Sequence, residues 1–238
     1  MQDTGRNLTH QLTHQLGSAI IQGSYAVDKS FPTEAELSQQ FNISRSVTRE
    51  AVKMLTAKGL LASRPRQGIR VMPSASWNMF DPDVLAWTLN ARPSLDLLRE
   101  FTQLRIAIEP EAARLAAQNN QDKPRIKAIA DALERMRKAD EGQDDPLSAD
   151  IEFHTAILAA SNNRFFLQLR QFIHVALRVS IASTNQLKGV FTASYDDHKK
   201  IYDEIVAGNG DAASDAVKYL LSEVMQLINL SLVKTPQN

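Results

Sequence analysis

The sequence predicts a mainly α-helical protein, in which a small N-terminal domain of three helices and one β-hairpin precedes a larger antiparallel all-α bundle. Apolar residues recur at helical spacing along most of the chain, and strand signals vanish after residue 73. Aromatic residues are sparse while Leu, Ala and Ile are plentiful, which favours helices. The 238 residues, of which 43% are apolar, suffice for one or two domains with real cores.

Residues 8–71 predict a winged helix-turn-helix. Leucine and isoleucine at four-residue spacing give residues 8–22 one apolar helical face. The capping box T-x-x-E at Thr33–Glu36 starts a second, short helix, and a tight turn separates it from a third. Ser44 is a good N-cap for that third helix, and Gly59 ends it.

The third helix and the wing are suited to contact duplex DNA. The outward positions at the start of this helix are Arg45, Ser46, Thr48 and Arg49. Guanidinium and hydroxyl groups placed there reach phosphates and base edges in the major groove. The expected strands 60–62 and 69–71 flank a basic turn, Arg64-Pro65-Arg66-Gln67-Gly68, which can lie against the minor groove.

Positive charge is concentrated in this region, although the whole chain is formally neutral. From Asn42 to Met72 there are seven Lys or Arg residues and a single acid, Glu50. Localised positive charge is expected where a small module displaces counterions from DNA. The competing interpretation is a small helical domain with a solvated basic face, but the order of cap, turn, helix and basic wing favours DNA.

Composition narrows the cellular setting. The chain has no cysteine, no apolar run long enough to span a membrane and no signal-peptide pattern at its N-terminus. We therefore expect a cytoplasmic protein without a membrane partner. We place the DNA-binding domain at residues 1–73, a linker at 74–79 and the all-α domain at 80–238.

The second domain is expected to be an antiparallel helical bundle. Recognised turn sequences such as Arg92-Pro93, Asn162-Asn163 and Gly208-Asn209-Gly210 separate its helices. The expected helices lie near residues 83–90, 94–119, 123–141, 146–161, 164–187, 192–207 and 211–233.

The bundle also carries a group of polar residues that point to a binding site. Asp150 and His154 lie four residues apart, on one helical face, among apolar neighbours. With His198 from another helix they can hold a divalent transition metal or hydrogen-bond a polar ligand. Arg105 lies in a largely apolar helix and is expected to bind either an anionic ligand or the carboxylate of Glu109 on the same helix. Because D-x-x-x-H is common by chance, an ordinary structural role for this group stays open.

Several motifs, in the same order, resemble the GntR family of bacterial transcription regulators, in its FadR-like branch with a C-terminal FCD ligand-binding domain. The N-terminal motif is FPTEAELSQQFNISRSVTREAVKMLTAKGLL followed by RQG. The C-terminal motifs are RIAIEPEAARLAA, DIEFHTAIL followed by SNN, and DHKKIYDEIVAGNGDAA. The resemblance covers nearly the whole chain and implies a homodimer that binds a palindromic operator under the control of a small carboxylic or sugar acid.

The resemblance also assigns roles to individual positions in the DNA-binding domain. Its DNA contacts map onto Ser44, Arg45, Ser46 and Arg49, with the wing tip at Gln67-Gly68. The family often has an arginine where this chain has Ala35, so the operator is expected to depart from the family's usual sequence.

In the helical domain, metal-binding members of the family hold an ion with one Asp and three His. Asp150, His154 and His198 match the first three, but Leu220 stands at the fourth position. We therefore expect a weaker, three-ligand site for zinc or nickel, or direct binding of the acid's hydroxyls by these residues. Arg105 matches the arginine that the family directs at the effector carboxylate, and Asn229 is a further candidate for the pocket.

The stretch WNMFDPDVLAWTL, with Ala35 and the missing fourth histidine, is similar to the galactonate and related sugar-acid regulators. The predicted function is therefore a DNA-binding repressor that is not an enzyme and is controlled by an acid such as an aldonate. A metal-dependent enzyme with a DNA-binding appendage is the alternative, but no nucleophile or general-base partner accompanies the Asp and His residues. A non-specific architectural DNA protein would leave them unexplained.

Overall fold

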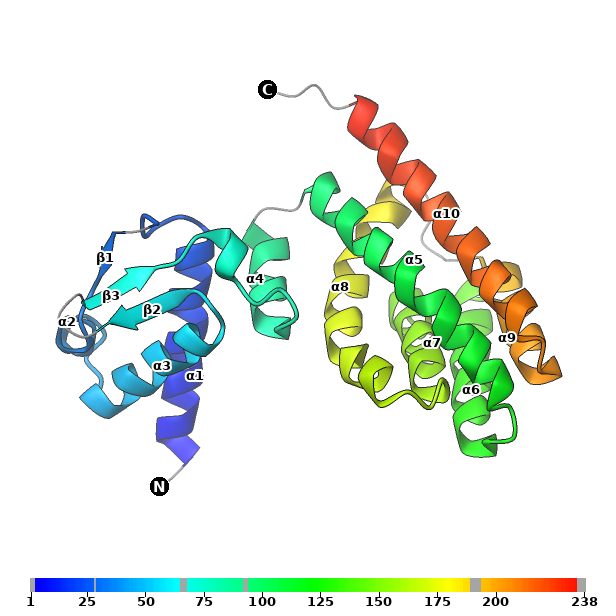
Figure 1. Cartoon of the computed structure of the whole chain (residues 1–238), viewed down its shortest axis with the longest axis horizontal. Coiled ribbons are helices and arrows are strands. Elements are labelled where there is room, and N and C mark those ends of the chain that lie inside the picture. The colour runs from blue at the N-terminus through cyan, green and yellow to red at the C-terminus, as the bar shows by residue number, and fades with distance from the viewer. Residues whose placement is uncertain (1–2, 28, 65–67, 92–93, 189–193, 235–238) are drawn as a thin grey trace. The chain divides into compact units, whose positions relative to one another are not determined.

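The computed structural model describes residues 3–27, 29–64, 68–91, 94–188 and 194–234. It divides the chain into two compact units, residues 1–93 and 94–238. The first unit contains a small sheet and the second is built from helices (Figure 1). The predicted fold class is confirmed, since a winged helix-turn-helix precedes an all-α domain.

The first unit is a winged helix-turn-helix with a three-stranded antiparallel sheet in the order β1-β3-β2. Its elements are α1 (Asp3–Ile21), β1 (Ser30–Phe31), α2 (Glu34–Gln40), α3 (Arg45–Ala57), β2 (Leu61–Arg64), β3 (Gly68–Val71) and α4 (Pro82–Ala91). The two wing strands were expected. The short strand β1 was not, because two residues are too few to show a periodic pattern.

Local sequence signals set the ends of α2 and α3, the two helices of the helix-turn-helix. Thr33 and Glu36 form both halves of a capping box at the start of α2. Ser44 caps α3, and its hydroxyl accepts a hydrogen bond from the Val47 amide. Gly59 follows the C-cap of α3 with a φ of +78°, a conformation that costs an L-residue energy.

Helix α4 belongs to the first unit, which corrects the predicted start of the second domain at residue 80. Val84 and Trp87 join the core formed by α1, α3 and the sheet. Trp87 packs against Gly17 of α1 so closely that an added Cβ there would lie 2.3 Å from the ring. Residues 74–79 are not a free linker either, because the Asn78 amide donates to the Lys58 carbonyl at 3.0 Å.

The second unit contains six helices among the residues that the structure describes. They are α5 (Leu95–Gln118), α6 (Lys123–Asp140), α7 (Pro146–Ala160), α8 (Arg164–Lys188), α9 (Tyr195–Ala207) and α10 (Gly210–Lys234). Each coincides within a few residues with a predicted helix. Helix α5 packs against α7, α9 and α10, so it lies at the centre of this unit (Figure 1).

Among the described residues, α10 is the one helix that is long and apolar enough to pass a test for a membrane span. Its segment Gly210–Val233 has a mean hydropathy of 1.2, which by length and composition alone would suffice to cross a membrane. Core helices of soluble proteins pass the same test, so this is weak evidence for a span. In the structure α10 packs along α5 and α9.

Candidate functional site

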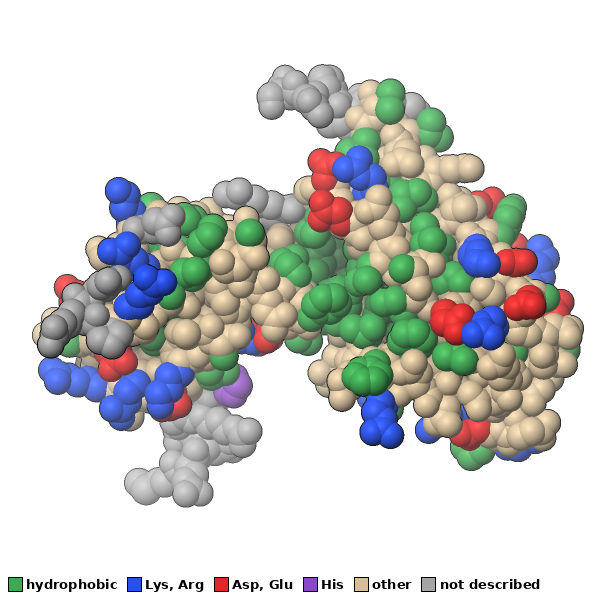
Figure 2. Space-filling model, viewed as in Figure 1, with side chains coloured by type: hydrophobic (Ala, Val, Ile, Leu, Met, Phe, Trp, Pro, Cys, Tyr) green, Lys and Arg blue, Asp and Glu red, His purple; other side chains and the backbone are tan. Residues whose placement is uncertain are grey.

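The start of α3 presents an exposed polar surface. Arg45, Ser46 and Arg49 are exposed in the first two turns, as predicted, and Ser44 is exposed at the N-cap. Figure 2 shows Lys and Arg side chains gathered over the first unit, where few acidic side chains accompany them. The arrangement is the one that a recognition helix needs to bring guanidinium groups into a groove of DNA.

One predicted contact in this helix is wrong. Thr48 is fully buried, and its hydroxyl donates to the backbone carbonyls of Arg45 at 2.9 Å and Glu34 at 3.2 Å. It therefore ties α3 to the start of α2 and does not face outwards. In the wing, Gly68 begins β3 and is exposed, while Arg66 and Gln67 lie outside the described residues.

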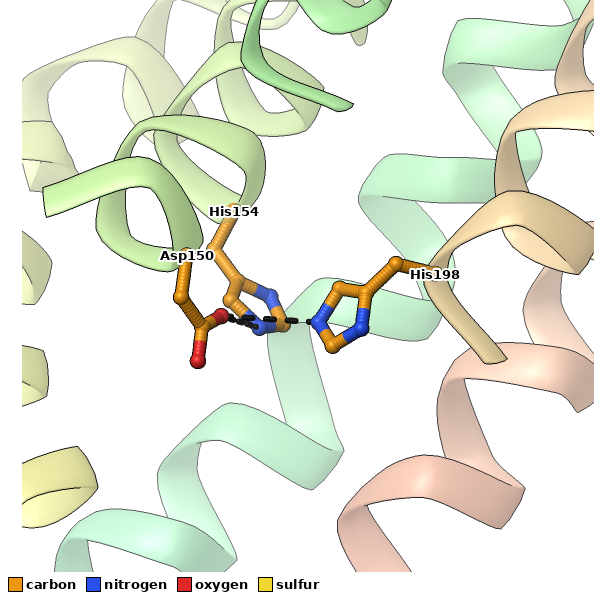
Figure 3. Close-up of side chains that lie close together, drawn as sticks. All are labelled: Asp150, His154 and His198. Carbon is orange, nitrogen blue, oxygen red and sulfur yellow. Dashed lines mark ion pairs between the residues drawn. The ribbon is translucent and has the colours of Figure 1, made fainter. Parts of the chain in front are cut away.

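The predicted cluster in the second unit does come together. Asp150 and His154 lie on α7 and His198 lies on α9, and their side chains converge on one point (Figure 3). Each is at most 4% exposed. One potential ligand atom from each lies within 4.8 Å of the other two. These three side chains and the α5 residues Arg105 and Glu109 are called the acid cluster below.

Hydrogen bonds from the far side of each ring orient the two histidines. Nδ1 of His154 lies 2.8 Å from Oε2 of Glu109, and Nδ1 of His198 lies 2.7 Å from the carbonyl oxygen of Ser194. Ionised carboxylates and carbonyls only accept hydrogen bonds, so both Nδ1 atoms carry the proton. In the neutral rings both Nε2 atoms then present a lone pair towards Asp150.

Two of the atoms that converge in this cluster lack a hydrogen-bond partner among the described residues. Oδ1 of Asp150 is 3.2 Å from Nε2 of His154 and 3.4 Å from Nε2 of His198. Oδ1 of Asp150 and Nε2 of His198 are buried and make no hydrogen bond among the described residues. Such groups are costly to bury unpaired, so three converging acceptors favour a cation between them.

The spacing fits a divalent transition metal. Bonds of about 2.1 Å meeting at a tetrahedral angle separate two ligand atoms by roughly 3.4 Å. The two separations from Asp150 Oδ1, 3.2 and 3.4 Å, already match this value. Leu220 is buried on α10 and offers no donor atom. Asp150, His154 and His198 would therefore hold zinc or nickel with coordination positions left open for an oxygen ligand.

Arg105 forms the internal pair that the sequence left open. Its Nε donates to Oε1 of Glu109 at 2.6 Å and its Nη2 donates to Oε2 at 3.2 Å. Both side chains are at most 3% exposed. Nη2 also lies 3.4 Å from Nδ1 and 3.2 Å from Nε2 of His154, nearly equal distances that place it outside the ring plane. The guanidinium therefore lies beside the candidate metal ligands and is already paired.

The ionisation of the acid cluster follows from these contacts. Burial opposes the charge on Asp150, but the imidazoles of His154 and His198 hold its pKa well below the ordinary value. Burial also opposes the charge on Glu109, yet Arg105 and His154 lower its pKa to about 2. Burial lowers the pKa of His154, but the carboxylate of Glu109 raises it by more. The pKa of His154 therefore lies above its ordinary value. Both carboxylates are thus available as anions at neutral pH.

Three further residues stand in relation to the acid cluster in ways that the sequence did not fully predict. Asn229, predicted to face the pocket, is exposed on α10 and is not part of the buried cluster. Ser194 was missed, because a backbone carbonyl leaves no mark in a sequence. Glu109 was recognised only as a partner of Arg105, and its contact with His154 depends on how α5 packs against α7.

Two family models match the chain. The model for bacterial regulatory proteins of the gntR family matches residues 8–71, and the FCD domain model matches residues 100–223. The uncharacterized HTH-type transcriptional regulator YieP of Escherichia coli K12 is 33% identical over 221 residues, which cover 91% of this chain and 93% of that protein. The galactonate operon transcriptional repressor of the same organism is 30% identical over 227 residues, covering 91% and 94%.

A solved structure shares the fold. Lar, described as controlling the expression of the Listeria monocytogenes agr system, superimposes with a TM-score of 0.60 at 16% identity, covering 93% of this chain and 96% of that one. At that identity the likeness speaks for the fold alone. The family matches and the two relatives favour a regulator over the alternative of a metal-dependent enzyme. The chain belongs to the GntR family of bacterial transcription regulators and carries an FCD domain.

Proposed function

We propose that this regulator is a cytoplasmic repressor that binds a palindromic operator as a homodimer and responds to a hydroxylated carboxylic acid in its FCD domain. The observation that carries this proposal is the convergence of three acceptor atoms beside a buried arginine, two of which have no hydrogen-bond partner among the described residues. A relative that shares most of its length is named a galactonate operon repressor, which supports a sugar acid such as an aldonate.

The chemistry of the acid cluster suits such a ligand. A divalent ion held by Asp150, His154 and His198 would supply Lewis acidity for a carboxylate and a neighbouring hydroxyl. Arg105 lies beside these ligands and adds positive charge where the carboxylate would bind. A site with these polar groups can distinguish a hydroxylated acid from an apolar acid of equal size.

A homodimer is proposed because the two half-sites of a palindrome require two identical DNA-binding domains. Apolar side chains on the second unit remain exposed in the single chain, among them Leu230 at 61% on α10 and Phe165 at 72% on α8. Exposed apolar surface of this kind favours association with another chain. Acid binding would then favour a dimer geometry in which the two readers no longer match the operator.

Operator release by a panel of acids tests the proposal. The operator is first selected from random duplexes. Ala35 replaces an arginine that the family often has, so the operator is expected to depart from the family's usual sequence. Aldonates, aldarates and uronates are then added in gel shifts, with zinc or with chelator. At least one acid is expected to weaken operator binding in the wild type, and chelation is expected to reduce that response.

Arg105→Ala is expected to retain operator binding and lose the response to the acid, because the guanidinium no longer attracts the carboxylate. Circular dichroism first confirms that the variant is folded, since Glu109 is left without its ion-pair partner. Arg114→Ala, half-buried on the same helix and paired with Glu111, is the matched control and should respond normally. An unaltered response in folded Arg105→Ala would refute the role of Arg105.

A further inference from the structure

Glu109 connects two parts of the acid cluster that have different tasks. Its Oε1 accepts from Nε of Arg105, and its Oε2 accepts from Nδ1 of His154. We propose that Glu109 is a positioning residue, which prepares Asp150, His154 and His198 to bind a divalent cation next to a buried arginine. The inference rests on the proposed function only in taking this cluster as the regulatory site.

The first part of this role is orientation. A carboxylate that accepts the proton of Nδ1 keeps the Nε2 lone pair of His154 directed at the point where Asp150 and His198 converge. Glu109 is itself held by two bonds from Arg105 on the same helix, so it has little freedom to turn away. His198 has only the Ser194 carbonyl in the corresponding position, which is a neutral acceptor.

The second part is charge. Nη2 of Arg105 lies 3.2 Å from Nε2 of His154, one of the candidate ligand atoms. A dication bound there would be repelled by the guanidinium in a buried, weakly screened environment. The carboxylate of Glu109 offsets the charge of Arg105, so that the charge of Asp150 remains for the cation. Without Glu109 the buried cluster would carry one positive and one negative group before a cation arrives.

Zinc titration of the full chain tests both parts without reference to DNA. Each variant is stripped with chelator and desalted, and calorimetry then measures the binding of zinc alone. Glu109→Gln preserves shape, removes the charge and is expected to weaken zinc binding about 10- to 100-fold. Glu111→Gln, two residues along the same helix and paired with Arg114, is the matched control and should bind like the wild type.

Arg105→Gln separates positioning from mere packing. It breaks the same ion pair as Glu109→Gln but leaves the carboxylate, so it is expected to bind zinc at least as tightly as the wild type. Equal weakening in both single variants would mean that the pair acts only through stability, and the proposal would fall. Zinc affinity of folded Glu109→Gln within twofold of the wild type would overturn it as well.

The double variant Arg105→Gln with Glu109→Gln covers the case in which a single variant does not fold. It leaves no buried charge on this part of α5, and circular dichroism is expected to show a folded chain whose zinc affinity lies between those of Glu109→Gln and the wild type. Wild-type affinity in the double variant would contradict a role for Glu109. Absence of zinc binding in the wild type would overturn the inference while leaving operator binding, measured separately, as the test of the proposed function.

Discussion

Replacing Arg49 by alanine is expected to weaken operator binding roughly 5- to 150-fold, which corresponds to the ~1–3 kcal/mol typical of one guanidinium contact with DNA. Arg49 is exposed on the second turn of α3, so the change removes a positive group without disturbing the core. Gel shifts at several salt concentrations measure the loss. A contact with phosphate would lower the salt slope by about one, whereas a contact with a base would relax the sequence preference at one position.

The control for this variant lies in the other unit. Lys127 is exposed on α6 and pairs with Asp131 on its own helix, so Lys127→Ala removes the same charge outside the DNA-binding unit. It should bind operator like the wild type. Binding of the acid, followed by thermal shift, should be unchanged in both variants. Normal operator affinity in Arg49→Ala would remove this residue from the DNA interface.

Gly59→Ala is expected to lower the free energy of unfolding of the first unit by about 2–5 kcal/mol. An alanine at a positive φ costs ~1–2 kcal/mol, and overpacking adds ~1–3 kcal/mol. The φ of Gly59 is +78°, and an added Cβ would lie 2.1 Å from the backbone oxygen of Ser76. Since the backbone at Ser76 is held next to α3 by the Asn78 amide and the Lys58 carbonyl, it cannot move away freely.

Gly68→Ala provides the matched comparison. Gly68 has nearly the same φ, +77°, but no atom lies within 4 Å of an added Cβ, so only the ~1–2 kcal/mol conformational cost should remain. Denaturant unfolding followed by tryptophan fluorescence measures both losses. Trp77 and Trp87 are the only tryptophans and both lie in the first unit, so the signal reports on that unit alone. Equal losses of unfolding free energy in the two variants would show that residues 74–79 pack only loosely against α3.

Ion pairs at Lys58 also hold the start of α4 against α3. Lys58, the C-cap of α3, donates from its ammonium to Asp81 and Asp83 at 2.7 and 2.8 Å. Burial disfavours the charge of Lys58, but the two carboxylates raise its pKa above the ordinary value. Asp81 and Asp83 therefore tie the start of α4 to the C-terminal end of the recognition helix.

Sequence patterns were sufficient for most elements of the fold. Caps and turn residues are local, so Thr33, Ser44 and Gly59 mark the ends of α2 and α3 before any packing is known. Periodicity failed where the element was short, as for β1. It also failed where a polar side chain bonds back to the main chain, as Thr48 does, because a hydroxyl looks the same in sequence whether it faces solvent or a buried carbonyl.

The sequence by itself determined that this chain contains a DNA-binding winged helix-turn-helix and a helical domain with Asp150, His154 and His198 as candidate ligands. Only the tertiary structure decided that these three converge, that Arg105 is already paired with Glu109, and that Asn229 stays outside. The tertiary structure also assigned α4 to the DNA-binding unit. The physical reason is that caps and periodicity act within one turn of helix, whereas these contacts depend on how α5, α7 and α9 pack against one another.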